Sequence, residues 1–241
     1  VLGLVFWRRA ESGGAAILAA VGAYSVVGLW DTGLPRVDRD FGRRHLAIVD
    51  FSLQPNASKH SATDAGLHGI NLNLLRHGKL PIAMNRWDGD LLDRARYVFL
   101  VAPQTRPGMR QRDDLNRFMH RGGTVVLTCG FLDATGSAGL LEPLGVRHSA
   151  TPLGRFFNLE AYGQRVSFMS AWTLDKVPGT AEVLCQTPDQ APLIVSVPVG
   201  KGRLILISDS EFFHNRNLEG HKNHDPQNTA FFKILLDRLD Q

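Results

Sequence analysis

The chain has 241 residues, a formal net charge of +4 and a hydrophobic content of 44%. This length suits one domain with an additional segment, and the composition excludes wholesale disorder. The positive charge is mild, and Lys and Arg do not cluster with aromatic residues, so the sequence argues against nucleic-acid binding.

The first element along the chain is an uncharged, apolar segment at residues 13–30. A membrane-spanning helix needs about 20 apolar residues, with about 17 as the lower limit. Arg8 and Arg9 precede this segment, Trp30 ends it and Asp31 follows. We therefore expect a transmembrane helix whose N-terminal end is cytoplasmic, because positive residues favour that side. The soluble domain is then expected outside the cytoplasm, on the periplasmic side.

Residues 1–7 are also apolar, and we interpret them as the possible end of another span. Within residues 13–30, small side chains recur at four-residue spacing through Ala15, Ala19 and Ala23. This spacing lets helices approach closely in lipid, so membrane proteins are the expected partners. A buried helix of a soluble protein and a signal-peptide core are the alternative interpretations.

Residues 31–44 are polar and rich in Arg, and they predict a linker before a domain at residues 45–241. Continuous apolar runs, such as YVFLVA and TVVLTC, are typical of strands buried on both faces. The sequence predicts strands at 45–52, 80–84, 97–102, 124–129, 193–199 and 203–208. It predicts helices at 63–76, 90–95, 110–120, 138–144 and 226–239.

Two turn signals complete the last third of the domain. Gly200-Lys201-Gly202 lacks the spacing of a phosphate-binding loop and predicts a hairpin between the last two strands. Asp225-Pro226 is typical of a helix cap followed by Pro in the first turn. Residues 149–192 are expected to be irregular, with a short strand-like piece at 181–186.

The alternation of strands and helices predicts an α/β fold with a doubly wound, mostly parallel sheet, a C-terminal β-hairpin and a final helix. Ligands of such sheets bind beyond the carboxyl ends of the strands. Four loops are therefore the expected site of function: 54–61, 103–108, 130–137 and 209–225.

Cys129 is the candidate nucleophile, because it closes a buried strand and precedes a predicted helix. A neighbouring base activates such a thiol, and His214 is the candidate base, oriented by Glu211 or Asp209. A buried structural cysteine is the alternative. Cys185 can pair with Cys129 in an oxidising compartment, although two cysteines do not make a disulfide framework.

A second candidate site is a crevice for a small ligand, such as a sugar or an anion. Its expected ligand-binding residues are polar groups at strand ends: Asp50, Ser52, Arg106, Asp209 and Asn215, with His214 beside them. For Asp50 and Ser52, capping of the loop is the alternative role. The His-rich stretch 209–228 matches no metal-binding spacing, so neither a metal nor a cofactor is expected.

Three motifs occur in a fixed order: APQTRPG after a strand, then HRGGTVVLTCG, then GKGRLILISDSEFFHNRNL followed by NTAFFKILLDRL. Over residues 44–239 this order resembles bacterial membrane-anchored domains of the class I glutamine-amidotransferase-like, flavodoxin-like superfamily, and accessory proteins of the GldG type. The resemblance implies a flavodoxin-like sheet. It also implies that Cys129 occupies the position of the amidotransferase nucleophile.

The chain departs from that family at the other catalytic positions. Leu127-Thr128-Cys129-Gly130-Phe131 replaces the Gly-x-Cys-x-Gly elbow, and Pro103-Gln104 replaces the Gly-Gly pair of the oxyanion hole. The His-Pro-Glu triplet is absent from the sequence. Nucleophile, base and oxyanion donors must all be present for catalysis. We therefore expect a non-catalytic, membrane-anchored binding or scaffold domain. The alternatives are a Cys-dependent hydrolase or amidotransferase-like enzyme, and a small-ligand binding domain.

Overall fold

The computed structural model describes residues 45–55, 57, 63–219 and 226–240. The predicted span, the linker and the cap at Asp225 lie outside the described residues. None of the helices in the described ranges is long and apolar enough to cross a bilayer.

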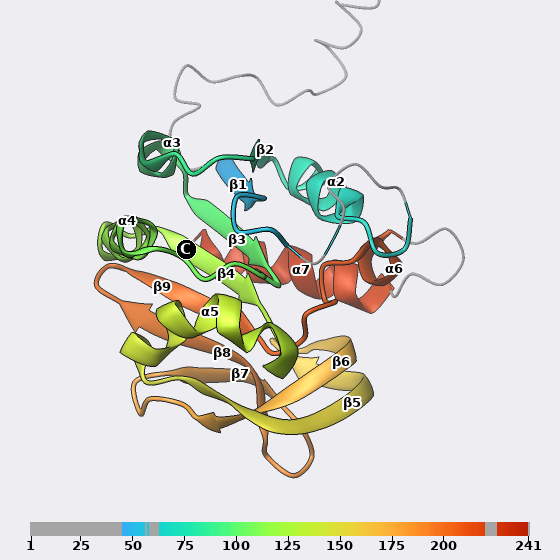
Figure 1. Ribbon diagram of the computed structural model, residues 1–241. Helices are drawn as coiled ribbons and strands as arrows, with labels where there is room; N and C mark the ends of the chain where they lie inside the picture. The colour runs from blue at the N-terminus through green and yellow to red at the C-terminus, as the bar shows by residue number, and fades with distance from the viewer. Residues whose placement is uncertain (1–44, 56, 58–62, 220–225, 241) are drawn as a thin grey trace, which may run out of the picture. The chain divides into compact units, whose positions relative to one another are not determined.

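A seven-stranded sheet forms the centre of the domain, in the order β2-β1-β3-β4-β9-β8-β7 (Figure 1). The first five strands in this order are mutually parallel, and β8 and β7 are antiparallel to their neighbours. The prediction of a mostly parallel sheet with a C-terminal hairpin is confirmed. The strands are β1 (Leu46–Asp50), β2 (Leu80–Met84), β3 (Tyr97–Val101), β4 (Thr124–Thr128), β7 (Glu182–Gln186), β8 (Pro192–Val199) and β9 (Gly202–Ile207).

Helices cover the two faces of this sheet, and most of the predicted helices are confirmed within a few residues. One face carries α2 (His68–Arg76), α6 (Asn215–Leu218) and α7 (Pro226–Leu239). The other carries α3 (Gly89–Arg94), α4 (Met109–His120) and α5 (Ala134–Leu141). Two short 3-10 helices, Phe131–Asp133 and Glu142–Leu144, flank α5.

The alternation of side chains along the parallel strands divides the interior into two cores. Phe99 of β3 packs edge-on against Phe213 and Phe232, with ring centroids 5.7 and 5.8 Å apart. Its neighbour Leu100 belongs to the opposite core, together with Phe118 of α4. Because both faces are buried, these strands read as continuous apolar runs in the sequence.

The region expected to be irregular instead contains a long antiparallel ribbon. Strands β5 (Arg147–Ala161) and β6 (Gln164–Lys176) pair over most of their length. Repeated register shifts interrupt the pairing, so the side chains lose the strict alternation from which a strand is recognised. The ribbon is joined to the first core by Val166, Phe168 and Ala171 of β6.

The side chain of Asn228 fixes this ribbon to α7. Its Nδ2 donates to the carbonyl oxygen of Ser167 at 3.0 Å, and its Oδ1 accepts from the amide of Ser167 at 2.8 Å. Asn228 is fully buried and Ser167 nearly so. Water therefore does not readily replace either partner.

Replacing Asn228 by Ala removes both bonds and leaves two buried backbone groups without partners. We expect the free energy of unfolding to fall by about 2–3 kcal/mol. Urea denaturation of the full chain, followed by circular dichroism, measures this loss. Lys233→Ala on the exposed side of the same helix is the control, with an expected change below about 0.5 kcal/mol. Equal stabilities of the two variants would contradict the role given to Asn228.

Candidate functional site

The loops after β1 and β3, where a doubly wound sheet opens its crevice, are hydrogen-bonded to each other. The amides of Gln104 and Thr105 donate to the carbonyl oxygen of Leu53 at 3.1 and 3.0 Å. Pro55 and Pro103 form an antiparallel bridge between the same loops. The backbone groups that a ligand would meet here are therefore already paired.

Asp50 and Ser52 have the loop-capping role. The carboxylate of Asp50 accepts from the amide and hydroxyl of Ser52 at 3.0 and 2.7 Å, and from the amide of Leu53 at 3.2 Å. Asp50 is almost fully buried, and burial raises its pKa above the ordinary value. Its oxygens hold the turn after β1.

The loops after β4 and β9 are connected through Asp133. This carboxylate accepts from Nε2 of Gln104 at 2.5 Å and from the hydroxyl of Ser210. The start of α5 also packs tightly on the β3 loop, because a Cβ added to Gly136 would lie 1.7 Å from the carbonyl oxygen of Pro103. Loops from three strands thus form one hydrogen-bonded layer at the carboxyl edge.

Cys129 follows β4 and is fully buried in the second core. Its Sγ lies 3.0 Å from Nε2 of His148, at the start of β5. Trp172 packs directly on Gly130, where a Cβ would lie 2.5 Å from the indole ring. The Trp172 ring in turn stacks on Phe131, with centroids 5.6 Å apart. These aromatic rings therefore cover the residue that follows Cys129.

The hydrogen bonds around His148 indicate its tautomer. The hydroxyl of Ser208 donates its one proton to the carbonyl oxygen of Trp172 at 2.7 Å. It therefore accepts from Nδ1 of His148, which lies 3.3 Å away. Nε2 is then the unprotonated nitrogen, and it accepts the S–H of Cys129.

Both members of this pair are neutral. Burial raises the pKa of the Cys129 thiol to about 12 and lowers the pKa of His148 to about 4. A nucleophilic cysteine needs the thiolate, which the surroundings of Cys129 disfavour. Cys185 is also buried, and both cysteines are free thiols.

The residues expected to activate Cys129 lie in the segment after β9. His214 precedes α6 and its amide donates to the carbonyl oxygen of Glu211 at 2.9 Å. The carboxylate of Glu211 forms an ion pair with Arg216. The backbone carbonyl oxygen of Glu211 also accepts a hydrogen bond from Nδ2 of Asn217 at 2.6 Å. The thiol of Cys129 contacts the ring of His148, a residue that the sequence did not indicate.

Asp209 and Asn215 connect separate parts of the fold. Asp209 is fully buried and accepts from the amides of Met169, Ser170 and Glu211 at 2.7, 3.1 and 2.8 Å. Burial raises its pKa to about 6, although these bonds favour the carboxylate. Asn215 accepts from the amide of Gly69 and donates to the carbonyl of Thr63, both at 2.7 Å.

Arg106 is the exposed member of the predicted set. Its guanidinium lies 3.8 Å from the carboxylate of Glu142, which is also exposed. Three of the residues that shape this edge were not predicted: Gln104, Asp133 and His148. Gln104 and Asp133 lie in loops that the sequence marked, but His148 lies in the unrecognised ribbon, where no sequence signal pointed to Cys129.

The sheet order, the helices on both faces and the closed carboxyl edge define a mixed α/β domain with a mostly parallel sheet. The chain belongs to the family described as "Domain of unknown function (DUF4350)", whose model matches residues 72–225. No curated protein matches the chain.

Several solved structures are similar in fold. The mmIFT52 N-terminal domain has a TM-score of 0.63 and 13% identity, over 80% of this chain and 96% of that one. Cytoplasmic Protein STM1381 from Salmonella typhimurium LT2 has a TM-score of 0.56 and 11% identity, over 82% and 100%. Cytoplasmic Protein STM3548 from Salmonella typhimurium has a TM-score of 0.52 and 12% identity, over 79% and 97%. At these identities the likeness shows the fold alone.

The low pKa of His148 predicts a loss of stability in acid. Its folded-state pKa of about 4 lies below the ordinary value of 6.5, so the unfolded chain binds the proton first as the pH falls. Between pH 7 and pH 4 this group should remove about 3 kcal/mol from the free energy of unfolding. Urea denaturation at stepped pH values measures the loss.

His148→Gln is the comparison for this effect, and it should lose less stability over the same pH range. Asp209 acts in the opposite direction, because its raised pKa makes the folded chain bind a proton first as the pH falls through about 6. That contribution is present in both proteins and cancels in the difference. Parallel pH profiles would show that His148 is accessible and ionises normally.

Proposed function

We propose that this chain is a non-catalytic, membrane-tethered domain that binds or organises other proteins of an envelope or transport-associated assembly. The proposal rests on the hydrogen bonds of the carboxylates at the carboxyl ends of the strands. Asp50, Asp133 and Asp209 are all occupied by hydrogen bonds within the domain. A carboxyl edge held in this way supports a structural role better than a reaction centre.

The tether is proposed from residues 13–30, whose length and lack of charge suit a span. The arginines before it favour a domain outside the cytoplasm. The stripe of Ala15, Ala19 and Ala23 supports membrane-protein partners, since small residues allow close helix contact in lipid.

We also infer a fold kinship with the flavodoxin-like, class I glutamine-amidotransferase-like superfamily and the GldG-type accessory proteins. The five parallel strands run in the order second, first, third, fourth, fifth along the chain, which is the flavodoxin-like order. Cys129 follows the fourth of these strands. This kinship concerns architecture and does not carry an activity.

Substitution within the alanine stripe tests the proposed membrane partners. The full chain is expected to stay in the membrane pellet after an alkaline carbonate wash, whereas a chain without residues 1–30 is expected in the supernatant. Ala19→Leu should remain in the pellet but reduce the size of the complex on native electrophoresis of a mild detergent extract. Bulk at this position separates packed helices.

Val21→Leu, two residues away and therefore on another side of the helix, is the matched control and should leave the complex intact. Release of the full chain by the carbonate wash would contradict the proposed membrane tether. A complex unaffected by Ala19→Leu would remove the proposed helix contact.

The buried thiol predicts slow chemistry at Cys129. With a limiting alkylating reagent at pH 7, the native full chain should be labelled at Cys129 at least about a hundredfold more slowly than the urea-unfolded chain, because the thiol is buried and protonated. Mass spectrometry locates the adduct. Cys185, which is also buried and has its pKa raised to about 12 by burial, is the internal comparison.

A Cys-dependent hydrolase or amidotransferase-like enzyme is the second candidate, favoured by the 3.0 Å contact between Cys129 and His148. In that case His148 replaces His214 as the base. Rapid labelling of Cys129 below neutral pH, together with a turnover that Cys129→Ala abolishes, would establish this candidate and overturn the non-catalytic proposal.

A further inference from the structure

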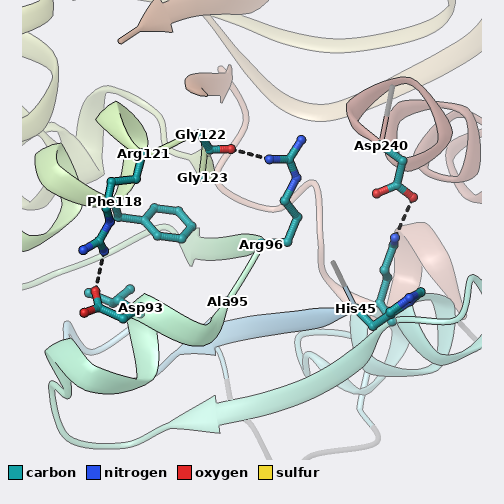
Figure 2. A pocket seen from close by; sticks show the side chains of 11 residues that line it. His45, Asp93, Ala95, Arg96, Phe118, Arg121, Gly122, Gly123 and Asp240 are labelled. Atoms are coloured by element: carbon teal, nitrogen blue, oxygen red, sulfur yellow. Dashed lines mark hydrogen bonds and ion pairs between the residues drawn. The ribbon is translucent and has the colours of Figure 1, made fainter. Parts of the chain in front are cut away.

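A pocket of about 740 Å³ lies at the edge of the sheet opposite to the carboxyl ends of the strands (Figure 2). It is formed where the chain enters successive strands: His45 before β1, Lys79 before β2, Arg96 before β3 and Gly123 before β4. The sequence offered no signal for it, because ligands of doubly wound sheets are expected at the other edge.

The walls of this pocket carry three permanent cations and two carboxylates. Lys79 pairs with Asp240 at 2.5 Å, and Arg121 pairs with Asp93. Arg96 donates instead to the carbonyl oxygens of Gly122 and Leu239, which carry no charge. These cations and carboxylates therefore give the lining of the pocket one positive charge in excess.

Figure 2 shows Arg96 between the Arg121–Asp93 pair on one side and Asp240 and His45 on the other. Its hydrogen bonds fix the guanidinium in place, with two of its five N–H groups directed to the two carbonyls. A cation held in this way is preorganised, so binding an anion requires little further ordering of its side chain.

We propose that this pocket binds a phosphoryl group, with Arg96 and Arg121 as its principal contacts. Guanidinium groups present planar pairs of donors that match phosphate oxygens. The mixed lining suits a small phosphorylated group, and pockets of this size hold small molecules.

Arg121 is the adjustable contact. Its side chain is 37% exposed and that of Asp93 is 51% exposed, so their ion pair is solvated and weak. A dianionic phosphate competes well with one solvated carboxylate. Lys79 is different, because it is almost buried and lies 5.2 Å from the centroid of the Tyr97 ring, in a fixed position.

Free phosphate compounds and lipid headgroups share this chemistry. The lipid source rests on the proposed tether, because 14 residues separate the apolar segment from His45, the first residue of the pocket along the chain. The site itself does not depend on the tether. An experiment that contradicts the phosphate site therefore leaves the membrane proposal untouched, and the reverse also holds.

The test is thermal unfolding of the full chain in a non-ionic detergent at pH 7. One arm titrates inorganic phosphate against sodium chloride of equal ionic strength. The other titrates six-carbon phosphatidylglycerol, below its micelle concentration, against six-carbon phosphatidylcholine. Binding to the folded chain raises the unfolding temperature. A rise with inorganic phosphate alone identifies a free phosphate compound, and a rise with phosphatidylglycerol alone identifies a headgroup.

Two variants at the adjustable contact make the test specific, while Arg96 is left intact because it holds the backbone. Arg121→Gln should raise the half-saturating concentration about fivefold or more, since a charge-assisted hydrogen bond is lost. Asp93→Asn should lower it about twofold, because the competing carboxylate is removed. Arg117→Gln, one turn earlier on α4 and likewise exposed and ion-paired, should leave it unchanged.

No anion-specific stabilisation in either arm would overturn the proposal. Identical titrations of the wild type, Arg121→Gln and Asp93→Asn would also overturn it, since the anion would then bind elsewhere.

Discussion

The burial of the central parallel strands on both faces is the constraint on which the rest of the structure depends. Strands β3 and β4 are buried along their whole length, so each face must be covered by apolar side chains of helices. The resulting two cores leave the sheet only its ends for contact with solvent. The function of such a domain therefore depends on the residues at the two ends of its strands.

The two ends differ in how their polar groups are used. At the carboxyl end, loops from β1, β3, β4 and β9 exchange hydrogen bonds, and the carboxylates of Asp50, Asp133 and Asp209 are buried. Burial there keeps Cys129 and His148 neutral, and neutral groups cost less to bury than charged ones. At the amino end, Arg121 remains partly exposed beside a pocket of about 740 Å³, whereas Lys79 is buried.

The parallel strands and most of the helices could be predicted because their signals are local. Runs such as those at 97–102 and 124–129 contain only buried positions, and Gly or Pro marks their ends. The β5–β6 ribbon could not be predicted in the same way, because bulges shift its register and β5 is largely exposed. Because His148 lies in that ribbon, its contact with Cys129 could not be predicted from the sequence either. Asp50 and Asp209 were selected correctly as strand-end groups, but only the packing decides that their oxygens accept backbone amides.

The position of β1 has a mechanical consequence. The strand lies between β2 and β3 and is parallel to both, paired with β2 along its five residues and with β3 at three positions. A pull on the chain before His45 acts along the axis of this strand. It would load the bonds on both sides together, in shear, instead of opening them one after another. A domain attached to a moving or stretched structure through that end would therefore resist extraction of its first strand, whereas an edge strand such as β2 or β7 would have only one row of bonds to resist the same force.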